Sequence, residues 1–239
     1  MRALPSRQRC TTEFAPGEQA LTSAAALFEA SWRDCWPALG TANDGLAVRD
    51  ALLAAYAEPQ RRYHTRQHLA ECLALLMRYR DLAAEPAEVE IALWFHDAVY
   101  DVKASDNEAR SADWAALELT AASVQPSRIA RVRELILTTR HDAVPQGEDA
   151  RLLVDIDLAI LGSSPARFAE YQAQIRAEYA WVPGPVFRSK RRAILLALLA
   201  RTPLYATPAL HDEFEIQARS NLAAATRQRN WWQRLFHQD

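Results

Sequence analysis

A histidine and an aspartate stand side by side in a largely apolar segment that runs from Leu93 to Asp101. Burying His96 and Asp97 among Trp, Phe and Val side chains costs free energy unless a partner satisfies both groups. Neutral imidazole and ionised carboxylate are both good ligands for divalent first-row metals. The pair therefore indicates a metal site, and the alternative is a buried histidine held by the aspartate beside it.

Three more histidines, His64, His68 and His141, favour the metal interpretation. His64 and His68 are four residues apart, so on a helix they share one face. The HxxxH spacing also occurs in zinc peptidases, but those enzymes need a glutamate base where this chain has Thr65, which excludes that class. Helical bundles often build metal sites from several facing helices, and such a site would suit histidines this far apart.

A second apolar segment, from Leu152 to Gly162, carries two carboxylates, Asp155 and Asp157. On a helix with about 3.6 residues per turn, these two side chains point roughly 200° apart. Only one of them is expected to face a given site. The other then has a structural role, such as a hydrogen-bonded carboxylate at a helix start.

The elements that must position these residues are predicted to be helices throughout. Gly is scarce and runs of β-branched residues are nearly absent, whereas Ala, Leu, Glu and Arg are abundant. Apolar spacing, prolines and caps predict helices over these parts of the chain: 18–36, 45–57, from His64 to about 80, from Pro86 through His96 and Asp97, from a capping box of Ser105 and Glu108, 129–139, 152–162, 165–179, 186–199 and 207–222.

Length and composition predict one all-α domain over residues 1–239, with an irregular segment at 1–17. Half of the 239 residues are hydrophobic, which is enough for one sizeable core. The net charge of −2 gives no reason to expect nucleic-acid binding, and neither a signal peptide nor a membrane span is expected. The cysteines at 10, 35 and 72 form no CxxC pair, which indicates structural thiols in a reducing, cytoplasmic setting.

Five motifs follow one another along the chain: Tyr63-His64-x-x-x-His68, Trp94-Phe95-His96-Asp97-x-x-Tyr100, Asn107-Glu108-x-x-Ser111, Thr138-x-x-His141 and Asp155-x-Asp157-Leu158-x-Ile160-Leu161-Gly162. In this combination the chain resembles the HD superfamily of metal-dependent phosphohydrolases, and within it a bacterial group of uncharacterised predicted phosphohydrolases. The likeness continues through residues 175–179 and 218–222. One departure is Thr65, where that group usually has Asn.

The resemblance implies a single HD-type helical bundle, on which C-terminal helices from residues 165–239 pack. The metal ligands that it implies are His68, His96, Asp97 and Asp157. The similar YHNxxH segment of cyclic-nucleotide phosphodiesterases assigns His68 to the metal and His64 to proton donation, although some HD proteins would align with these two roles exchanged.

Further residues have a catalytic and a structural interpretation side by side. Together with His64 and Asp97, the catalytic candidates are Glu108 and His141. Glu108 also suits a capping box, and His141 also suits the end of a helix, where the helix dipole favours a histidine. Three arginines that could clamp a phosphate are otherwise surface charges: Arg176, Arg188 and Arg191.

The function that the resemblance implies is metal-dependent hydrolysis of phosphate esters, with nucleotide-like mono- or diesters as the default substrates. The cofactor would be a divalent ion, Mn, Fe, Co, Ni, Zn or Mg, which activates a water molecule and polarises a phosphoryl oxygen. The expected partner is a small phosphorylated substrate. A homodimer is considered through Trp231, Trp232 and Phe236, which otherwise form a packed terminal helix. The alternative function is a non-catalytic module that binds a nucleotide or a metal.

Overall fold

The structure is a computed structural model in which residues 16–227 are described, with side chains described from residue 24 onward. Within this range the prediction of an all-α fold is confirmed, because helices dominate and no strand occurs. The elements in chain order are α1 (Pro16–Ala38), α2 (Leu46–Ala55), α3 (Arg66–Tyr79), the 3-10 helix η1 (Arg80–Leu82), α4 (Pro86–Phe95), α5 (Asn107–Ala121), α6 (Pro126–Thr138), α7 (Glu148–Asp157), the 3-10 helix η2 (Leu158–Gly162), α8 (Pro165–Glu178), α9 (Gly184–Ala200) and α10 (Pro208–Thr226).

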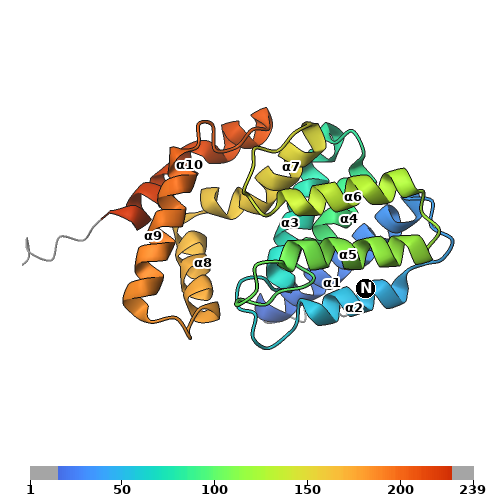
Figure 1. Cartoon of the computed structure of the whole chain (residues 1–239), viewed down its shortest axis with the longest axis horizontal. Helices are drawn as coiled ribbons and strands as arrows, with labels where there is room; N and C mark the ends of the chain where they lie inside the picture. The colour runs from blue at the N-terminus through green and yellow to red at the C-terminus, as the bar shows by residue number, and fades with distance from the viewer. Residues whose placement is uncertain (1–15, 228–239) are drawn as a thin grey trace, which may run out of the picture.

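Helix α4 lies at the centre of the bundle and packs against α1, α3, α5, α6 and α7 (Figure 1). All of its residues from Glu88 to Phe95 are buried, as expected for a helix that is apolar on nearly every side. Its two buried carboxylates are paired, Glu88 with Arg131 and Glu90 with Arg80. The central helix is therefore held on all sides, and it fixes the position of the His96-Asp97 turn at its C-terminal end.

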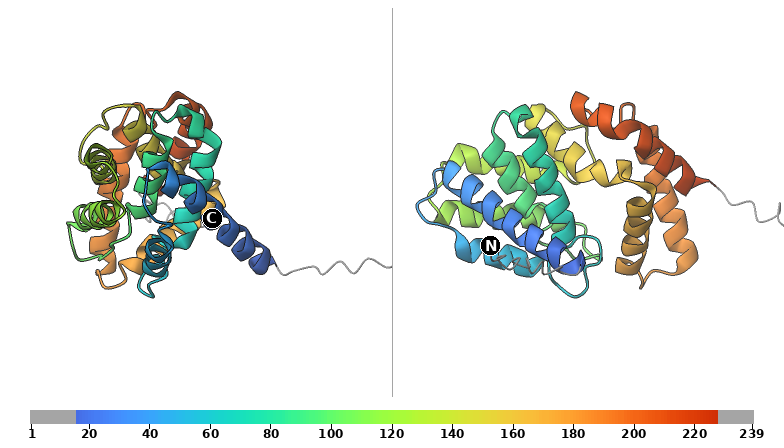
Figure 2. Two further views of the ribbon diagram at one scale, coloured as in Figure 1. Left: turned by 90° about the vertical axis from the view of Figure 1, so that its right-hand side faces the viewer. Right: turned by 180° about the vertical axis from the view of Figure 1, so that it is seen from behind.

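A cluster of three tryptophans fastens α1 to α4. The rings of Trp32 and Trp36 stack at 4.8 Å, and Trp94 meets Trp32 edge-on at 5.1 Å. The indole nitrogen of Trp94 also donates to Ser31, 2.9 Å away. Large aromatic pairs of this kind contribute both buried area and directional contacts. Seen from behind, α1 crosses the back of the bundle beside α3 (Figure 2).

The C-terminal helices lie at one end of the bundle. Helices α8 and α9 run side by side, and α10 lies across η2 (Figure 1). The Asn221 amide of α10 donates to the carbonyls of Leu161 and Ser163, at 2.8 and 2.9 Å. Among the described helices, none has both the length and the apolar character that crossing a membrane would require.

Three local predictions differ from the structure. Helix α1 already begins at Pro16 and includes Pro37, which was expected to end it. The capping box of Ser105 and Glu108 is wrong, because Asp106 precedes the helix and no side chain caps it. Instead, the Asn107 side-chain amide accepts the backbone N–H of Asp101 and donates to the Asp101 carbonyl. The rest of the expected irregular segment, Cys10 and the aromatic residues at 231, 232 and 236 lie outside the described residues.

Candidate metal centre

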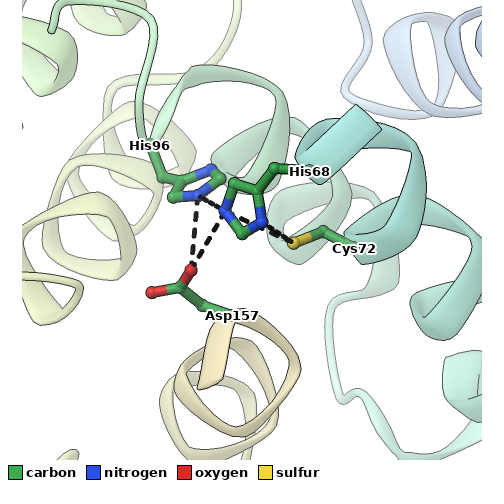
Figure 3. A group of neighbouring side chains, drawn as sticks. All are labelled: His68, Cys72, His96 and Asp157. Atoms are coloured by element: carbon green, nitrogen blue, oxygen red, sulfur yellow. Dashed lines mark hydrogen bonds and ion pairs between the residues drawn. The ribbon is translucent and has the colours of Figure 1, made fainter. Parts of the chain in front are cut away.

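Four side chains of the predicted site converge on one point inside the bundle. They are His68 from the first turn of α3, His96 and Asp97 from the turn after α4, and Asp157 from the last residue of α7. The two Nε2 atoms of the histidines are 3.1 Å apart. Asp157 Oδ1 is 3.2 Å from Nε2 of His68 and 3.6 Å from Nε2 of His96, and Figure 3 shows this carboxylate directed between the two rings. Asp97 Oδ2 is 3.5 and 3.0 Å from the same two atoms.

These separations fit a shared divalent cation. Ligand atoms that lie 2.0–2.2 Å from one ion are about 2.8–3.6 Å apart in tetrahedral or octahedral geometry. The measured distances of 3.0–3.6 Å fall within that interval. Two imidazole nitrogens and two carboxylate oxygens form a mixed N/O set that suits first-row metals. The structure therefore contains a group of residues that could hold a metal ion.

His96 is oriented by a backbone hydrogen bond. Its Nδ1 donates to the carbonyl of Leu93 at 2.8 Å, which directs Nε2 toward the centre. The prediction that His96 and Asp97 lie within the helix is wrong, since α4 ends at Phe95 and Ala98 N closes a turn onto the Phe95 carbonyl.

The turn after α4 is held by Arg61, a buried residue of the loop before α3. Its guanidinium donates to the carbonyls of Asp97 at 2.6 Å, Ala98 at 2.8 Å and His64 at 3.2 Å. Glu58 neutralises the guanidinium from the other side, with 3.0 Å between Nε and Oε2. Arg61 thus satisfies carbonyls that have left the helix, and it joins the His96-Asp97 turn to the His64 loop.

The two carboxylates of α7 point to different places, as expected from their spacing. Asp157 faces the centre, and its second oxygen lies 2.9 Å from Nε2 of His141. Asp155 instead accepts the backbone N–H groups of Ala206 at 3.1 Å and Thr207 at 2.5 Å, just before α10. Asp155 therefore fastens the start of a helix, whereas Asp157 belongs to the candidate centre.

Charge is balanced within the centre. Burial alone would raise the pKa of Asp157, but hydrogen bonds with His141, His68 and His96 hold it well below its ordinary value. Burial alone would lower the pKa of His96, but the charge of Asp97 raises it well above its ordinary value. The centre thus favours positive charge where the four side chains meet, and a divalent cation supplies such charge.

His64 lies beside the centre and is held by Glu178, the last residue of α8. One carboxylate oxygen of Glu178 accepts the N–H groups of Arg62, Tyr63 and His64, at 2.8, 2.8 and 3.1 Å. The other accepts Nδ1–H of His64 and the Tyr100 hydroxyl, both at 2.9 Å. This arrangement leaves Nε2 of His64 available for proton exchange.

Glu178 is ionised at neutral pH. Burial alone raises its pKa, but the hydrogen bond and charge of His64 and the backbone donors at Arg62 and Tyr63 lower it to about 2. No role for Glu178 was predicted from the sequence: it lies in the segment 175–179 that the resemblance covers, but nothing local links it to His64, more than a hundred residues away. Arg61 was missed because the carbonyls that it binds, those of Asp97 and Ala98, lie more than thirty residues further along the chain.

Cys72 is a further residue of this group that was predicted to be only structural. One ligand atom from each of His68, Cys72, His96 and Asp157 lies within 4.8 Å of the others (Figure 3). Its Sγ is 3.7 Å from Nδ1 and 3.8 Å from Nε2 of His68. By comparison, Asp97 Oδ2 lies 3.5 and 3.0 Å from Nε2 of His68 and His96. The spacing of four residues from His68 was the signal in the sequence.

Glu108 stands apart from these contacts. It is half-buried in the first turn of α5, and among the described residues it makes none of the hydrogen bonds or ion pairs of the centre. The predicted phosphate clamps are also dispersed: Arg176 donates to the Tyr179 carbonyl at 2.6 Å, and Arg188 is exposed. Arg191 differs, because it lines a cavity beside His64, His141 and Asp157.

Comparison of the chain with protein-family models, with curated proteins and with solved structures gave no match. The proposed function therefore rests on the chemistry of the residues and on the geometry of the centre.

Proposed function

We propose that this protein is a metal-dependent hydrolase of phosphate esters. The observation that carries the proposal is the convergence of His68, His96, Asp97 and Asp157 at distances that suit one divalent cation. The resemblance of their order along the chain to the HD superfamily gives the reaction class. A cavity that His64, His141 and Asp157 line gives a substrate access to this centre.

The residues of the chain have separate tasks in this proposal. A bound cation would supply a Lewis acid for a phosphoryl oxygen and would activate a water molecule. His68, His96, Asp97 and Asp157 would hold the cation, and His64 would donate a proton from Nε2 to the leaving oxygen. Glu178 is a positioning residue, which holds the ring of His64 through Nδ1. His141, which is bonded to Asp157 and lines the cavity, would contact the phosphate.

The experiment compares two aspartates of one helix. The purified protein is loaded with Mn²⁺, and its metal content and its hydrolysis of an aryl phosphate are measured for Asp157→Ala and Asp155→Asn. We expect Asp157→Ala to lose both the metal and the activity, because Asp157 faces the other three ligands. Asp155→Asn should keep the metal, since its carboxylate bonds the backbone before α10.

Two outcomes would contradict the proposal. If neither variant changes metal binding, the four side chains do not form the site. If the wild-type protein binds Mn²⁺ but hydrolyses no aryl or alkyl phosphate, the metal serves a non-catalytic binding module instead.

A further inference from the structure

A cavity of about 870 Å³ begins at the candidate metal centre and extends along α8 and α9. His64, His141 and Asp157 line its inner end. Its other walls come from η2, α8, the turn around Trp181 and α9. Helices α8 and α9 are the two orange helices that lie side by side in Figure 1. A substrate with its phosphate at the metal would therefore place its remaining part against these walls.

The walls away from the centre are largely hydrocarbon. Apolar side chains of η2, α8 and α9 line them, including Ile160, Ile175 and Phe187. Three further lining residues are large apolar side chains left strongly exposed: Trp181 at 55%, Val186 at 46% and Ile194 at 52%. Exposed apolar surface that gathers in one place marks a binding site more often than isolated residues do.

The same walls offer few side-chain acceptors for the hydroxyl and amino groups of a sugar or a base. Of the described residues that line the cavity, none is Ser, Thr, Asn or Gln, and Asp157 is the one carboxylate. A nucleoside would have to bury several N–H and O–H donors here with few acceptors to receive them, which is unfavourable. An alkyl or aryl group has no such groups to satisfy and gains free energy from burial.

The charged lining residues other than Asp157 are cationic, and they match the phosphate. They are Arg140, Lys190, Arg191 and Arg201, besides the two histidines. Within the described part of the chain, three buried polar atoms of this lining have no hydrogen-bond partner: Tyr63 Oη, His141 Nδ1 and a terminal nitrogen of Arg191. Tyr63 is only 4% exposed, so its hydroxyl group has no access to bulk solvent. Phosphate oxygens are acceptors that would satisfy the Tyr63 hydroxyl and the Arg191 N–H groups.

We propose that the cavity binds a phosphate ester of a large apolar alcohol, aliphatic or aromatic, and that it selects against nucleotides. This inference rests on the proposed function for the position of the phosphate. It replaces the nucleotide-like substrate expected from the sequence with an apolar phosphate ester, because this ester matches the hydrocarbon walls, the cations and the unpartnered donors.

A series of n-alkylphosphonates tests the proposal without requiring turnover. Binding to the Mn²⁺-loaded protein is measured by calorimetry for chains of increasing length, from methyl to octyl. Burial of one methylene corresponds to about a fourfold change in affinity, and we expect a dissociation constant that falls by about this factor per carbon until the cavity is filled. Adenosine monophosphate should bind at least tenfold more weakly than octylphosphonate.

A matched pair of variants tests whether the affinity for long-chain phosphonates arises in the cavity. Ile194→Asn puts an amide on the cavity wall, whereas Ile216→Asn makes the same change on α10, at an 84% exposed residue that does not line the cavity. We expect the first to weaken octylphosphonate binding about tenfold and the second to leave it unchanged. Arg191→Gln should weaken every member of the series by a similar factor, because it acts on the phosphonate group.

The outcomes separate this inference from the function on which it rests. Chain-length dependence that Ile194→Asn reduces supports the cavity even if no ester is hydrolysed, in which case only the hydrolase proposal fails. Hydrolysis of an aryl phosphate without chain-length dependence, or tighter binding of adenosine monophosphate, overturns the apolar substrate. A dimer that buries Ile194 and excludes octylphosphonate would overturn it as well.

Discussion

At the scale of single residues, His64 and His68 have different surroundings although they are only four residues apart. His68 is buried, and its Nε2 is within 3.2 Å of both His96 and Asp157. The Nδ1 of His64 is bonded to Glu178, and its ring stacks on Tyr100 at 4.2 Å. Their surroundings support a ligand role for His68 and a proton-donor role for His64, although the alignment alone permitted either order.

We predict that His68→Ala loses the metal, whereas His64→Ala keeps it and loses rate. Removal of a general acid typically costs about 10²–10⁴-fold in rate. The loss should be smaller for an aryl phosphate than for an alkyl phosphate, because a good leaving group needs little protonation. The measurements are the metal content of each variant and its rates of hydrolysis of an aryl and an alkyl phosphate. A His64→Ala protein without metal would show that His64 is the ligand.

At the scale of elements, the end of α8 is tied to the loop before α3 through Glu178. Five donors meet this one buried carboxylate: three backbone N–H groups, the His64 ring and the Tyr100 hydroxyl. Its pKa is lowered to about 2 from an ordinary value of 4.5. A depressed carboxyl pKa stabilises the fold above the unfolded-state pKa, and this contribution is lost as pH falls toward the folded-state pKa.

Glu178→Gln should therefore lose stability in a pH-dependent way. A lowering of this size corresponds to about 3 kcal/mol at neutral pH. The difference in unfolding free energy between wild type and variant should be largest above about pH 5 and should shrink as pH falls toward 2. Urea unfolding across this range measures it. A difference that does not change with pH would exclude this role.

The helices themselves were largely predictable from the sequence, but the contacts that connect them were not. Apolar spacing and the prolines at 86, 126, 165 and 208 locate most helices, and helix geometry separates Asp155 from Asp157. The end of α4 has no glycine or proline to announce it, because Arg61 from a distant loop supplies the partners. Glu178 and the cavity walls likewise depend on how α8 and α9 pack, which local patterns do not specify.

At the scale of the whole molecule, the candidate centre connects three helices that are far apart in sequence. A cation held by His68, the His96-Asp97 turn and Asp157 would join α3, the end of α4 and α7. A ligand that binds only the folded chain adds about 2.7 kcal/mol at a hundred times its dissociation constant. For a chain of this length, that corresponds to a rise of about 5–10 °C in Tm.

Removal of the metal should therefore lower Tm by about this amount. Thermal unfolding followed by circular dichroism, with Mn²⁺ and then with a chelator, measures the difference. Asp157→Ala should melt at one temperature in both conditions. If the wild-type Tm is the same with Mn²⁺ and with the chelator, no cation joins the three helices.

The two aspartates of α7 also restrict how the length of this chain can vary. Asp157 must meet the centre while Asp155 meets the backbone before α10, so both depend on one rotational setting of the helix. Insertion of one residue just before Asp155 would turn both carboxylates by about 100° and break both connections together. Insertions are accommodated instead in the exposed loop at residues 142–147, upstream of the helix. Insertions and deletions are thus expected in the loop before α7 and not in the last turn of this helix.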